Sequence, residues 1–287
     1  MNNPDVSVGP GFNVCLPIPE GYAHSFCLLE LAELIAYSLQ SLGHSVTTGP
    51  NRIEPDRRNV IVGCHLLEDH LAAALPADTI MVNTEQIYEA HPEGWNDGIY
   101  ARATRFETWD YSPQNLAAFA DQGVSGVKLL KIGHQPELTR IAKSDNPDID
   151  VLFYGSITPR RMPFFQQIRD RGLNLVTLLG VYSAERDSYI SRAKVVLNLH
   201  NHPTEIFEVV RVHYLLSNSV AVVSEINDTT SVPDFYADAV AGVSCDRLAD
   251  ECLRLVNDSE ARTELQNRGY QLISQHPQTA YTAAALE

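Results

Sequence analysis

The segment KVVLNLHNHPTEIFEVVRVHYLLSNSVAVVSE, residues 194–225, decides the fold class of this 287-residue chain. It begins with an apolar run at residues 194–200 and ends with a second one at residues 220–225, and both runs are typical of buried strands. Between them, residues 205–219 carry apolar side chains at helical spacing. The segment therefore predicts a strand, a helix and a second strand, which is the repeating unit of an α/β fold.

The same alternation continues through the second half of the chain. Strands are expected at residues 150–156 and 173–180, and helices at residues 162–172 and 183–193. A pair of helices is expected over residues 246–276. This order predicts one doubly wound α/β domain.

The first half of the chain shows an independent series of the same kind. Apolar runs that predict strands occur at residues 12–19, 44–49, 59–65, 78–86, 103–112 and 127–137, and helical patterns occur at residues 25–44, 65–75 and 113–123.

A polar stretch at residues 142–150 has little periodicity and is interpreted as a linker. The chain is therefore expected to form two doubly wound, Rossmann-like α/β domains, residues 1–141 and 151–287, that face a cleft. The last helix is a candidate to pack back on the N-terminal domain. In such folds ligands bind outside the carboxyl ends of the strands.

The composition limits the class of partner and the compartment. The formal net charge is −15, so the chain lacks the basic footprint that a nucleic acid or an anionic membrane requires. The five cysteines are scattered without a C-x-x-C motif, which is typical of free thiols in a reducing compartment. No segment approaches the roughly 20 apolar residues of a transmembrane helix. We therefore expect a cytoplasmic protein that is not an integral membrane protein.

Two histidines in the opening segment raise the question of a metal site. His200 and His202 alternate as on one face of a strand, and Glu205, Glu208 and His213 follow closely. Zinc binds such side chains, but a His-x-His pair is a weak signal by itself. Histidines with a purely structural role are a second alternative, and a ligand pocket at the strand end is a third.

The chain resembles a known family of enzymes over most of its length. The stretches that carry the resemblance are VLFYGSITPRR (residues 151–161), LLGVYSAERDSYISRAKVVLNLH (178–200), IFEVVRVHYLLSNSVAVVSE (206–225), LGHSVTTG (42–49) and KIGHQPEL (131–138). Their order and spacing are similar to those of GT-B fold glycosyltransferases, near family four. The resemblance implies a C-terminal domain that binds a nucleotide sugar and an N-terminal domain that binds the acceptor.

The resemblance also implies a set of donor-binding residues. Glu208 matches the second of two glutamates in the family's donor site, and it would accept hydrogen bonds from the ribose hydroxyls. His200 stands where the first glutamate would be and would face the sugar or the diphosphate. Gly155 and Ser156, in a turn after a strand, would offer backbone N–H groups to a phosphate.

Further positions are candidates with defined roles. Arg160 or Arg161 would neutralise the diphosphate leaving group, so that no obligatory metal or other cofactor is expected. Arg211 is expected to pair with Glu208 or another neighbour. Three residues that end strands of the first half are rival bases for the acceptor hydroxyl, and two further histidines are candidates to line the acceptor side or the cleft. The rival bases are His65, Glu85 and Asp110, and the two histidines are His24 and His134.

The sequence thus predicts a metal-independent glycosyltransferase that moves a sugar from a nucleotide diphosphate sugar to an acceptor hydroxyl or similar nucleophile. The acceptor class (glycan, small molecule or protein) stays open. Two alternatives remain. One is a GT-B-like protein that binds a nucleotide sugar or a partner but has lost turnover, since histidine replaces a glutamate at position 200. The other is a sugar-nucleotide epimerase, which would share the donor pocket.

Overall fold

The computed structural model describes residues 11–89, 91, 93–233 and 235–287. The chain forms two compact units, of which unit 1 comprises the residues up to Lys131 together with Gln278–Glu287, and unit 2 comprises Ile132–Pro277. The division lies before the predicted linker at residues 142–150, so residues 132–141 belong to unit 2 rather than to the N-terminal domain. The last ten residues return to unit 1.

Unit 1 contains a parallel sheet with the strand order β2-β1-β3-β4-β5-β6. Its strands are β1 (Phe12–Leu16), β2 (Val46–Pro50), β3 (Arg58–Val62), β4 (Ile80–Asn83), β5 (Glu107–Asp110) and β6 (Lys128–Leu129). The strand order reverses between β1 and β3, because β2 lies on one side of β1 and all later strands lie on the other. Such a reversal is the usual ligand-binding point of an open α/β sheet.

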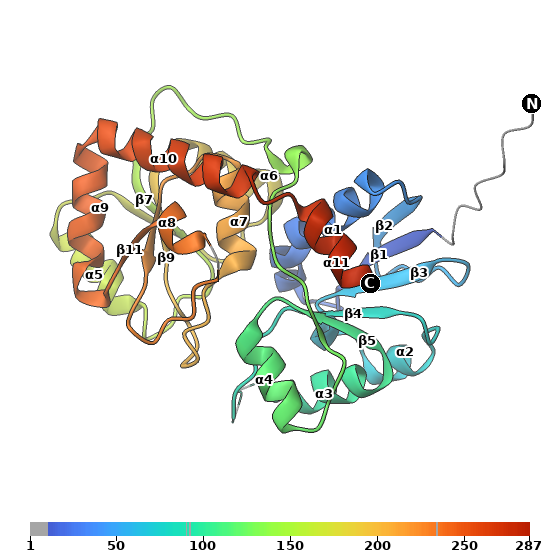
Figure 1. The fold of residues 1–287 in the computed structure, drawn as a ribbon. Helices are drawn as coiled ribbons and strands as arrows, with labels where there is room; N and C mark the ends of the chain where they lie inside the picture. The colour runs from blue at the N-terminus through green and yellow to red at the C-terminus, as the bar shows by residue number, and fades with distance from the viewer. Residues whose placement is uncertain (1–10, 90, 92, 234) are drawn as a thin grey trace, which may run out of the picture. The chain divides into compact units, whose positions relative to one another are not determined.

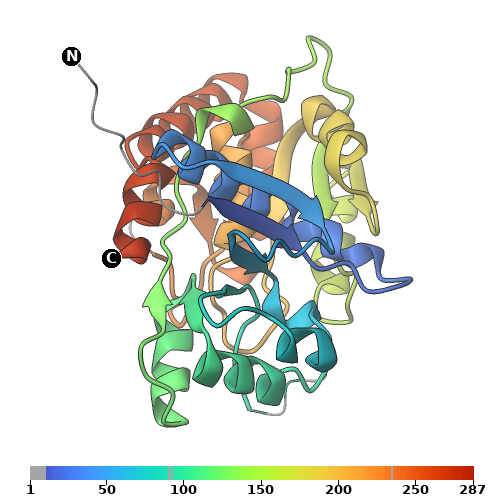
Figure 2. The same cartoon turned by 90° about the vertical axis from the view of Figure 1, so that its right-hand side faces the viewer.

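Helices cover both faces of the unit 1 sheet. They are α1 (Leu29–Ser41), α2 (Asp69–Ala73), α3 (Asn96–Arg105), α4 (Pro113–Asp121) and α11 (Gln278–Leu286). Figure 1 shows α1 and α11 together on one face and α2, α3 and α4 on the other. In Figure 2 the green α3 and α4 again lie across the sheet from the red α11. Helix α11 is fixed to α1 by a buried hydrogen bond of 2.7 Å between the hydroxyls of Thr282 and Ser38.

Unit 2 repeats the plan with a parallel sheet in the order β11-β10-β9-β7-β8. Its strands are β7 (Ile149–Tyr154), β8 (Leu175–Leu178), β9 (Ala193–Asn198), β10 (Val222–Glu225) and β11 (Ala241–Val243). Its helices are α5 (Met162–Asp170), α6 (Ser183–Arg192), α7 (Val209–Ser217), α8 (Tyr236–Ala239), α9 (Leu248–Asn257) and α10 (Ser259–Ser274). The strand order reverses between β7 and β9.

Alternation along β7 divides its side chains between the two faces of the sheet. Val151 and Phe153 lie in the core that α5 and α9 cover. Tyr154 lies on the other face, beside arginines of α6 and α7. The aromatic side chain at the end of β7 is thereby placed at the edge of the sheet where ligands bind in this class of fold.

The expected fold class, two doubly wound α/β units, is confirmed, and several boundaries differ. The helix expected over residues 205–219 begins only at Val209, because Ile206 forms a parallel bridge with Ser231 and Glu205 adopts a left-handed φ of 48°. Helix α3 includes residues 103–105, which were expected to start a strand. Within the described residues, no helix is both long enough and apolar enough to cross a membrane.

Candidate functional site

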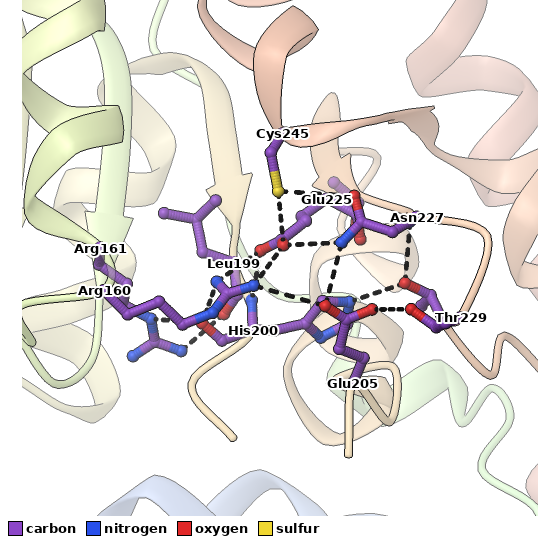
Figure 3. A network of polar contacts seen from close by, with 11 residues as sticks. Arg160, Arg161, Leu199, His200, Glu205, Glu225, Asn227, Thr229 and Cys245 are labelled. Atoms are coloured by element: carbon purple, nitrogen blue, oxygen red, sulfur yellow. Dashed lines mark hydrogen bonds and ion pairs between the residues drawn. The ribbon is translucent and has the colours of Figure 1, made fainter. Parts of the chain in front are cut away.

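The carboxyl ends of β7, β9 and β10 bring together the predicted donor-site residues of unit 2. Gly155 follows β7, His200 follows β9 and Glu225 ends β10. These strands are neighbours in the sheet, and β7 and β9 flank the point where the strand order reverses. Of the predicted residues, Arg160, Arg161 and His200 lie together at this edge with Glu225 (Figure 3).

Arg160 is already paired with a carboxylate at this edge. Its two terminal nitrogens donate to the two oxygens of Glu225, at 2.9 and 2.5 Å, and Nη1 also donates to the carbonyl of His200. Burial alone would raise the pKa of Glu225, but hydrogen bonds from Arg160, Cys245 and Asn227 lower it to about 2. Glu225 is therefore ionised at neutral pH and neutralises Arg160.

Arg161 is buried and is held by neutral groups. Arg161 is 2% exposed, and its guanidinium donates to the backbone carbonyls of Leu199, His200 and Ser156. Burial and the nearby charge of Arg211 lower the pKa of Arg161 to about 10, so it still carries a full charge at pH 7. No carboxylate in the described part of the chain forms a hydrogen bond with it.

Arg211 does not form the ion pair that the sequence suggested. Its Nη1 donates to the Oδ1 atom of Asn198 at 2.9 Å. Its guanidinium lies over the rings of Phe153 and Tyr154, at 5.6 and 5.3 Å from their centres. A second uncompensated positive charge thus lies next to Arg161.

The turn at Gly155 differs from the prediction in one respect. The N–H of Gly155 donates to the carbonyl of Leu178, and the next helix begins only at Met162. The N–H of Gly155 is therefore unavailable to a phosphate, and Gly155 and Ser156 do not lie at a helix N-terminus. Pro163 opposes an earlier start, because proline has no N–H to donate and is tolerated only in the first turn of a helix. Gly155 is needed instead for its φ of 131°.

Glu208 lies at the N-terminus of α7, and its role toward a ribose stays a prediction. It caps the start of α7, where its backbone carbonyl accepts from the N–H groups of Arg211 and Val212. Its side-chain carboxylate forms no hydrogen bond or ion pair within the ranges that the structure describes. A negative charge at a helix N-terminus is favourable, so this carboxylate is both stable there and available to a ligand.

His200 is almost fully buried beside these groups. Its backbone N–H donates to Glu225, its Nε2 lies 3.2 Å from the hydroxyl of Thr230, and its Nδ1 has no hydrogen-bond partner. Burial lowers the pKa of His200, although the carboxylates of Glu225, Glu208 and Glu205 oppose that change. His200 is therefore neutral at pH 7.

The loop between β9 and α7 is closed by polar contacts rather than by a metal cluster. Glu205 accepts from Thr229 and Asn227 and lies 3.7 Å from Arg160. Among the residues described, no three His, Cys, Asp or Glu side chains are placed to hold a metal ion. The expectation that no metal is required stays a prediction.

In unit 1, two of the three rival bases form a pair. His65 lies in the 3-10 turn Cys64–Leu66 after β3, and its Nε2 is 3.3 Å from Oε1 of Glu85, which follows β4. The side chain of His65 is 3% exposed and that of Glu85 is 21% exposed. Burial, with the charges of Arg102 and His91, lowers the pKa of His65 to about 3. His65 is therefore neutral and donates to Glu85 when its proton is on Nε2.

Asp110, the third rival, is unsuited to meet an acceptor because it is 0% exposed. Its carboxylate accepts from the side-chain amides of Asn83 and Asn115 and from the backbone N–H of Ser112. Burial raises the pKa of Asp110 to about 7, against these hydrogen bonds. The two asparagine amides also bind the backbone carbonyl of Glu85. Asp110 thus fixes the turn that carries Glu85.

The remaining two histidines lie in different surroundings. His24 is exposed in the 3-10 helix Ala23–Leu28, with its ring 5.5 Å from that of Tyr22. His134 belongs to unit 2 and is 7% exposed. Its ring Nδ1 lies 3.1 Å from the hydroxyl of Ser217, and its backbone N–H donates to the backbone carbonyl of His276. His134 is thus engaged inside unit 2.

Sequence reasoning did not single out Asn83, Asn115 and Cys245 as parts of these networks. Asn83 ends an apolar strand, MVN, and that position was a usable signal because polar residues at strand ends face the ligand edge. Asn115 and Cys245 offered no local signal. They are brought to Asp110 and Glu225 only by the tertiary fold.

Comparison by sequence gives little. No protein-family model matches the chain. The uncharacterized protein L138 of Acanthamoeba polyphaga mimivirus is 32% identical over 80 residues, which are 27% of this chain and 9% of that protein.

Comparison by structure shows the fold. Anabaena HepE in complex with UDP-glucose is 11% identical with a TM-score of 0.57, and the match covers 96% of this chain and 98% of HepE. WaaG, a glycosyltransferase involved in lipopolysaccharide biosynthesis, has the same identity and TM-score, with 96% and 99% covered. S. aureus TarM has a TM-score of 0.53 at 11% identity, and the chain spans 56% of it. The solved structures that resemble the chain are GT-B glycosyltransferases, and the chain has their fold.

Proposed function

We propose that the chain is a glycosyltransferase that moves a sugar from a nucleotide diphosphate sugar to an acceptor hydroxyl or similar nucleophile, without an obligatory metal. One observation carries the proposal. At the carboxyl edge of the unit 2 sheet, three carbonyls hold the buried guanidinium of Arg161, and the carboxylate of Glu208, at the N-terminus of α7, has no hydrogen bond or ion pair within the described residues. A carboxylate suits ribose hydroxyls and a cation suits a diphosphate, so this pair matches the two polar parts of the donor.

The proposed chemistry follows from charge that is fixed before the reaction. Negative charge develops on the diphosphate as the glycosidic bond breaks, and a guanidinium already held in place stabilises it without reorganisation. Arg161 cannot move far, since three carbonyls hold it. Binding of the donor places the anomeric carbon against the acceptor and supplies much of the rate enhancement by positioning alone.

On the acceptor side, Glu85 is the proposed base among the three candidates. Its carboxylate is the most exposed of the three, whereas His65 and Asp110 are buried. A histidine whose pKa is about 3 is a poor base but a good neutral donor that can orient a carboxylate. His65 would therefore orient Glu85, and Asp110 would fix the backbone beneath it. His24 stays a candidate for acceptor contact because it is exposed.

Removing the charge of Glu208 is expected to weaken the binding of nucleotides selectively. Because a charge-assisted hydrogen bond contributes about 1.5–3 kcal/mol, Glu208→Gln should weaken nucleoside diphosphate binding by about tenfold to a hundredfold. Isothermal calorimetry measures the change, and the melting temperature checks the fold. Glu264→Gln, on the exposed side of α10, removes an equal charge and should change nothing. Equal affinities of the Glu208 and Glu264 variants would contradict the assignment.

Turnover tests the reaction itself. The protein is incubated with nucleotide sugars, and released nucleoside diphosphate, free sugar and isomerised donor are separated by chromatography. Slow release of diphosphate and sugar supports a transferase, since water can replace the acceptor. Conversion of the intact donor to an isomer would instead identify an epimerase.

A protein that binds the donor without turnover is the second candidate function. The observation that favours it is His200, which replaces the family's first glutamate and is neutral and buried. Binding of a nucleotide sugar with no release of diphosphate from any donor tested would support this alternative.

A nucleic-acid acceptor is not proposed. One of the similar structures is a DNA-modifying β-glucosyltransferase crystallised with uridine diphosphoglucose. This chain carries a net charge of −15, which opposes binding to a phosphate backbone. We propose a glycan, small-molecule or protein acceptor and a cytoplasmic location.

A further inference from the structure

Three arginines lie at the carboxyl edge of the unit 2 sheet, and they differ in how their charge is balanced. Arg160 is neutralised by two hydrogen bonds to Glu225. Arg161 is 2% exposed, and each of its three guanidinium nitrogens already donates to a carbonyl. Arg211 is partly exposed and donates one hydrogen bond, to Asn198. Of these three, Arg211 alone combines a charge that no carboxylate among the described residues balances with partial exposure to solvent.

Arg211 is held rigidly although no carboxylate binds it. Its guanidinium lies over the rings of Phe153 and Tyr154, and the amide oxygen of Asn198 accepts from Nη1. Cation–π contacts of this kind stabilise a guanidinium. Both rings come from the end of β7. The rings and the amide fix the position of the cation and leave its charge intact.

The location of Arg211 is electrostatically unfavourable unless an anion is present. It lies in the first turn of α7, where the helix dipole is positive and a cation is destabilising. Its charge also lowers the pKa of Arg161, which reflects repulsion between the two guanidinium groups. Two like charges beside a positive helix end create a local potential that attracts phosphate.

The turn at Gly155 leaves the outer edge of Arg211 accessible. A Cβ atom at residue 155 would lie 3.0 Å from Nη2 of Arg211, which is closer than side chains normally pack. Glycine removes this obstruction and also permits the left-handed φ of 131°. The space beside Nη2 is therefore kept free of protein side chain at this position.

We infer that Arg211 binds the phosphoryl groups of the ligand at this edge, in place of Arg160, whose charge Glu225 already neutralises. The inference rests on the proposed function, because it names the residue that holds the diphosphate of the donor. The planar guanidinium can donate two parallel hydrogen bonds to one phosphoryl group. The ligand class is a diphosphate ester, and Arg160 serves to hold Glu225 and the His200 loop.

Calorimetric titration with inorganic pyrophosphate, UDP and UMP in metal-free buffer tests the inference. Arg211→Gln should weaken the binding of pyrophosphate and of UDP by about tenfold to a hundredfold, and that of UMP by less. Arg211→Lys keeps the charge but not the planar group, so its affinity for pyrophosphate should lie between those of the wild type and Arg211→Gln. Arg171→Gln is the matched control, because it removes an equal charge from an exposed position that pairs with Asp250.

The outcomes separate this inference from the proposed function. If UDP binds and Arg211→Gln leaves its affinity unchanged, the inference is overturned and the proposed function stands. If pyrophosphate binds through Arg211 but none of the nucleoside diphosphates binds more tightly than pyrophosphate, the inference stands and the proposed function falls. If neither pyrophosphate nor any of UDP, GDP, TDP and ADP binds the wild-type protein, both are overturned.

Discussion

Replacing Glu225 by alanine is expected to lower the free energy of unfolding of unit 2 by about 3 kcal/mol, because it removes the fully buried partner of an ion pair whose other member, Arg160, is one-third exposed. Glu225 is fully buried and accepts from the guanidinium of Arg160, the amide of Asn227, the thiol of Cys245 and the N–H of His200. All four donors would lose this acceptor at once, and the backbone N–H of His200 would lose the one acceptor that it has among the described residues. Burying unpaired donors is more costly than the net gain from forming the bonds.

Hydrogen exchange measures this loss within unit 2. The amides of β9 and β10 should exchange at least a hundredfold faster in Glu225→Ala than in the wild type, since each 1.4 kcal/mol is a factor of about ten. Glu251→Ala is the control, because Glu251 forms an ion pair with Arg254 on the surface of α9. Surface pairs contribute only about 0–1 kcal/mol. Equal exchange rates in the two variants would contradict the role of Glu225.

Replacing Asp110 by asparagine is expected to remove a loss of unit 1 stability that occurs as the pH rises from about 4 to about 7. Burial raises the pKa of Asp110 from 3.8 to about 7, so the folded protein keeps a proton that the unfolded chain releases near pH 4. Its contribution to stability is present below pH 4 and is lost as the pH rises to about 7. The loss across this window is on the order of 4 kcal/mol. Asparagine does not titrate, so the variant lacks this loss.

The difference in stability between the wild type and Asp110→Asn measures the contribution of Asp110 alone. His65 contributes a slope of opposite sign between about pH 3 and 6.5, because its pKa is lowered, but it does so in both proteins. Both tryptophans, Trp95 and Trp109, lie in unit 1, so urea unfolding followed by tryptophan fluorescence reports on that unit. Asp110→Asn should be less stable than the wild type at pH 5, and the deficit should shrink by pH 8. A stability deficit that does not change with pH would contradict the assignment. The control is Asp121→Asn, at an exposed position, whose stability should equal that of the wild type at every pH.

The two buried carboxylates therefore give the two units opposite responses to acid. The pKa of Glu225 is lowered to about 2, so its contribution to unit 2 is present above its ordinary pKa of 4.5 and is lost as the pH falls toward 2. The difference has a simple origin. Glu225 has a guanidinium partner and Asp110 has only neutral donors.

The order of elements could be predicted from the sequence because it depends on periodicity. The apolar run that became β9 and the helical spacing that became α7 both depend on burial of one face, which is a local property of the chain. The start of α7 could not be predicted in the same way. Glu205 and Ile206 continue the helical pattern, but contacts with Thr229 and Ser231, about 25 residues later in the chain, hold them in a loop.

The candidate site was predictable to the extent that it depends on strand ends. Gly155 and His200 lie just beyond the ends of β7 and β9, which are neighbouring parallel strands, and their roles toward a ligand stay predictions. The pairing of charges was not predictable. Sequence reasoning assigned an anion-binding role to Arg160 or Arg161 and an ion pair to Arg211. The fold pairs Arg160 with Glu225, and no carboxylate among the described residues forms a hydrogen bond with Arg211. Which arginine meets which glutamate depends on distances across the sheet that spacing along the chain does not encode.

Calorimetric titration of the wild-type protein with UDP, GDP, TDP and ADP, with and without a divalent metal chelator, tests the central claim most directly. The donor-site assignment predicts micromolar binding of one nucleotide, with an affinity that the chelator does not change. Absence of binding by all four nucleotides would contradict the glycosyltransferase assignment, and binding that the chelator abolishes would contradict a metal-independent site.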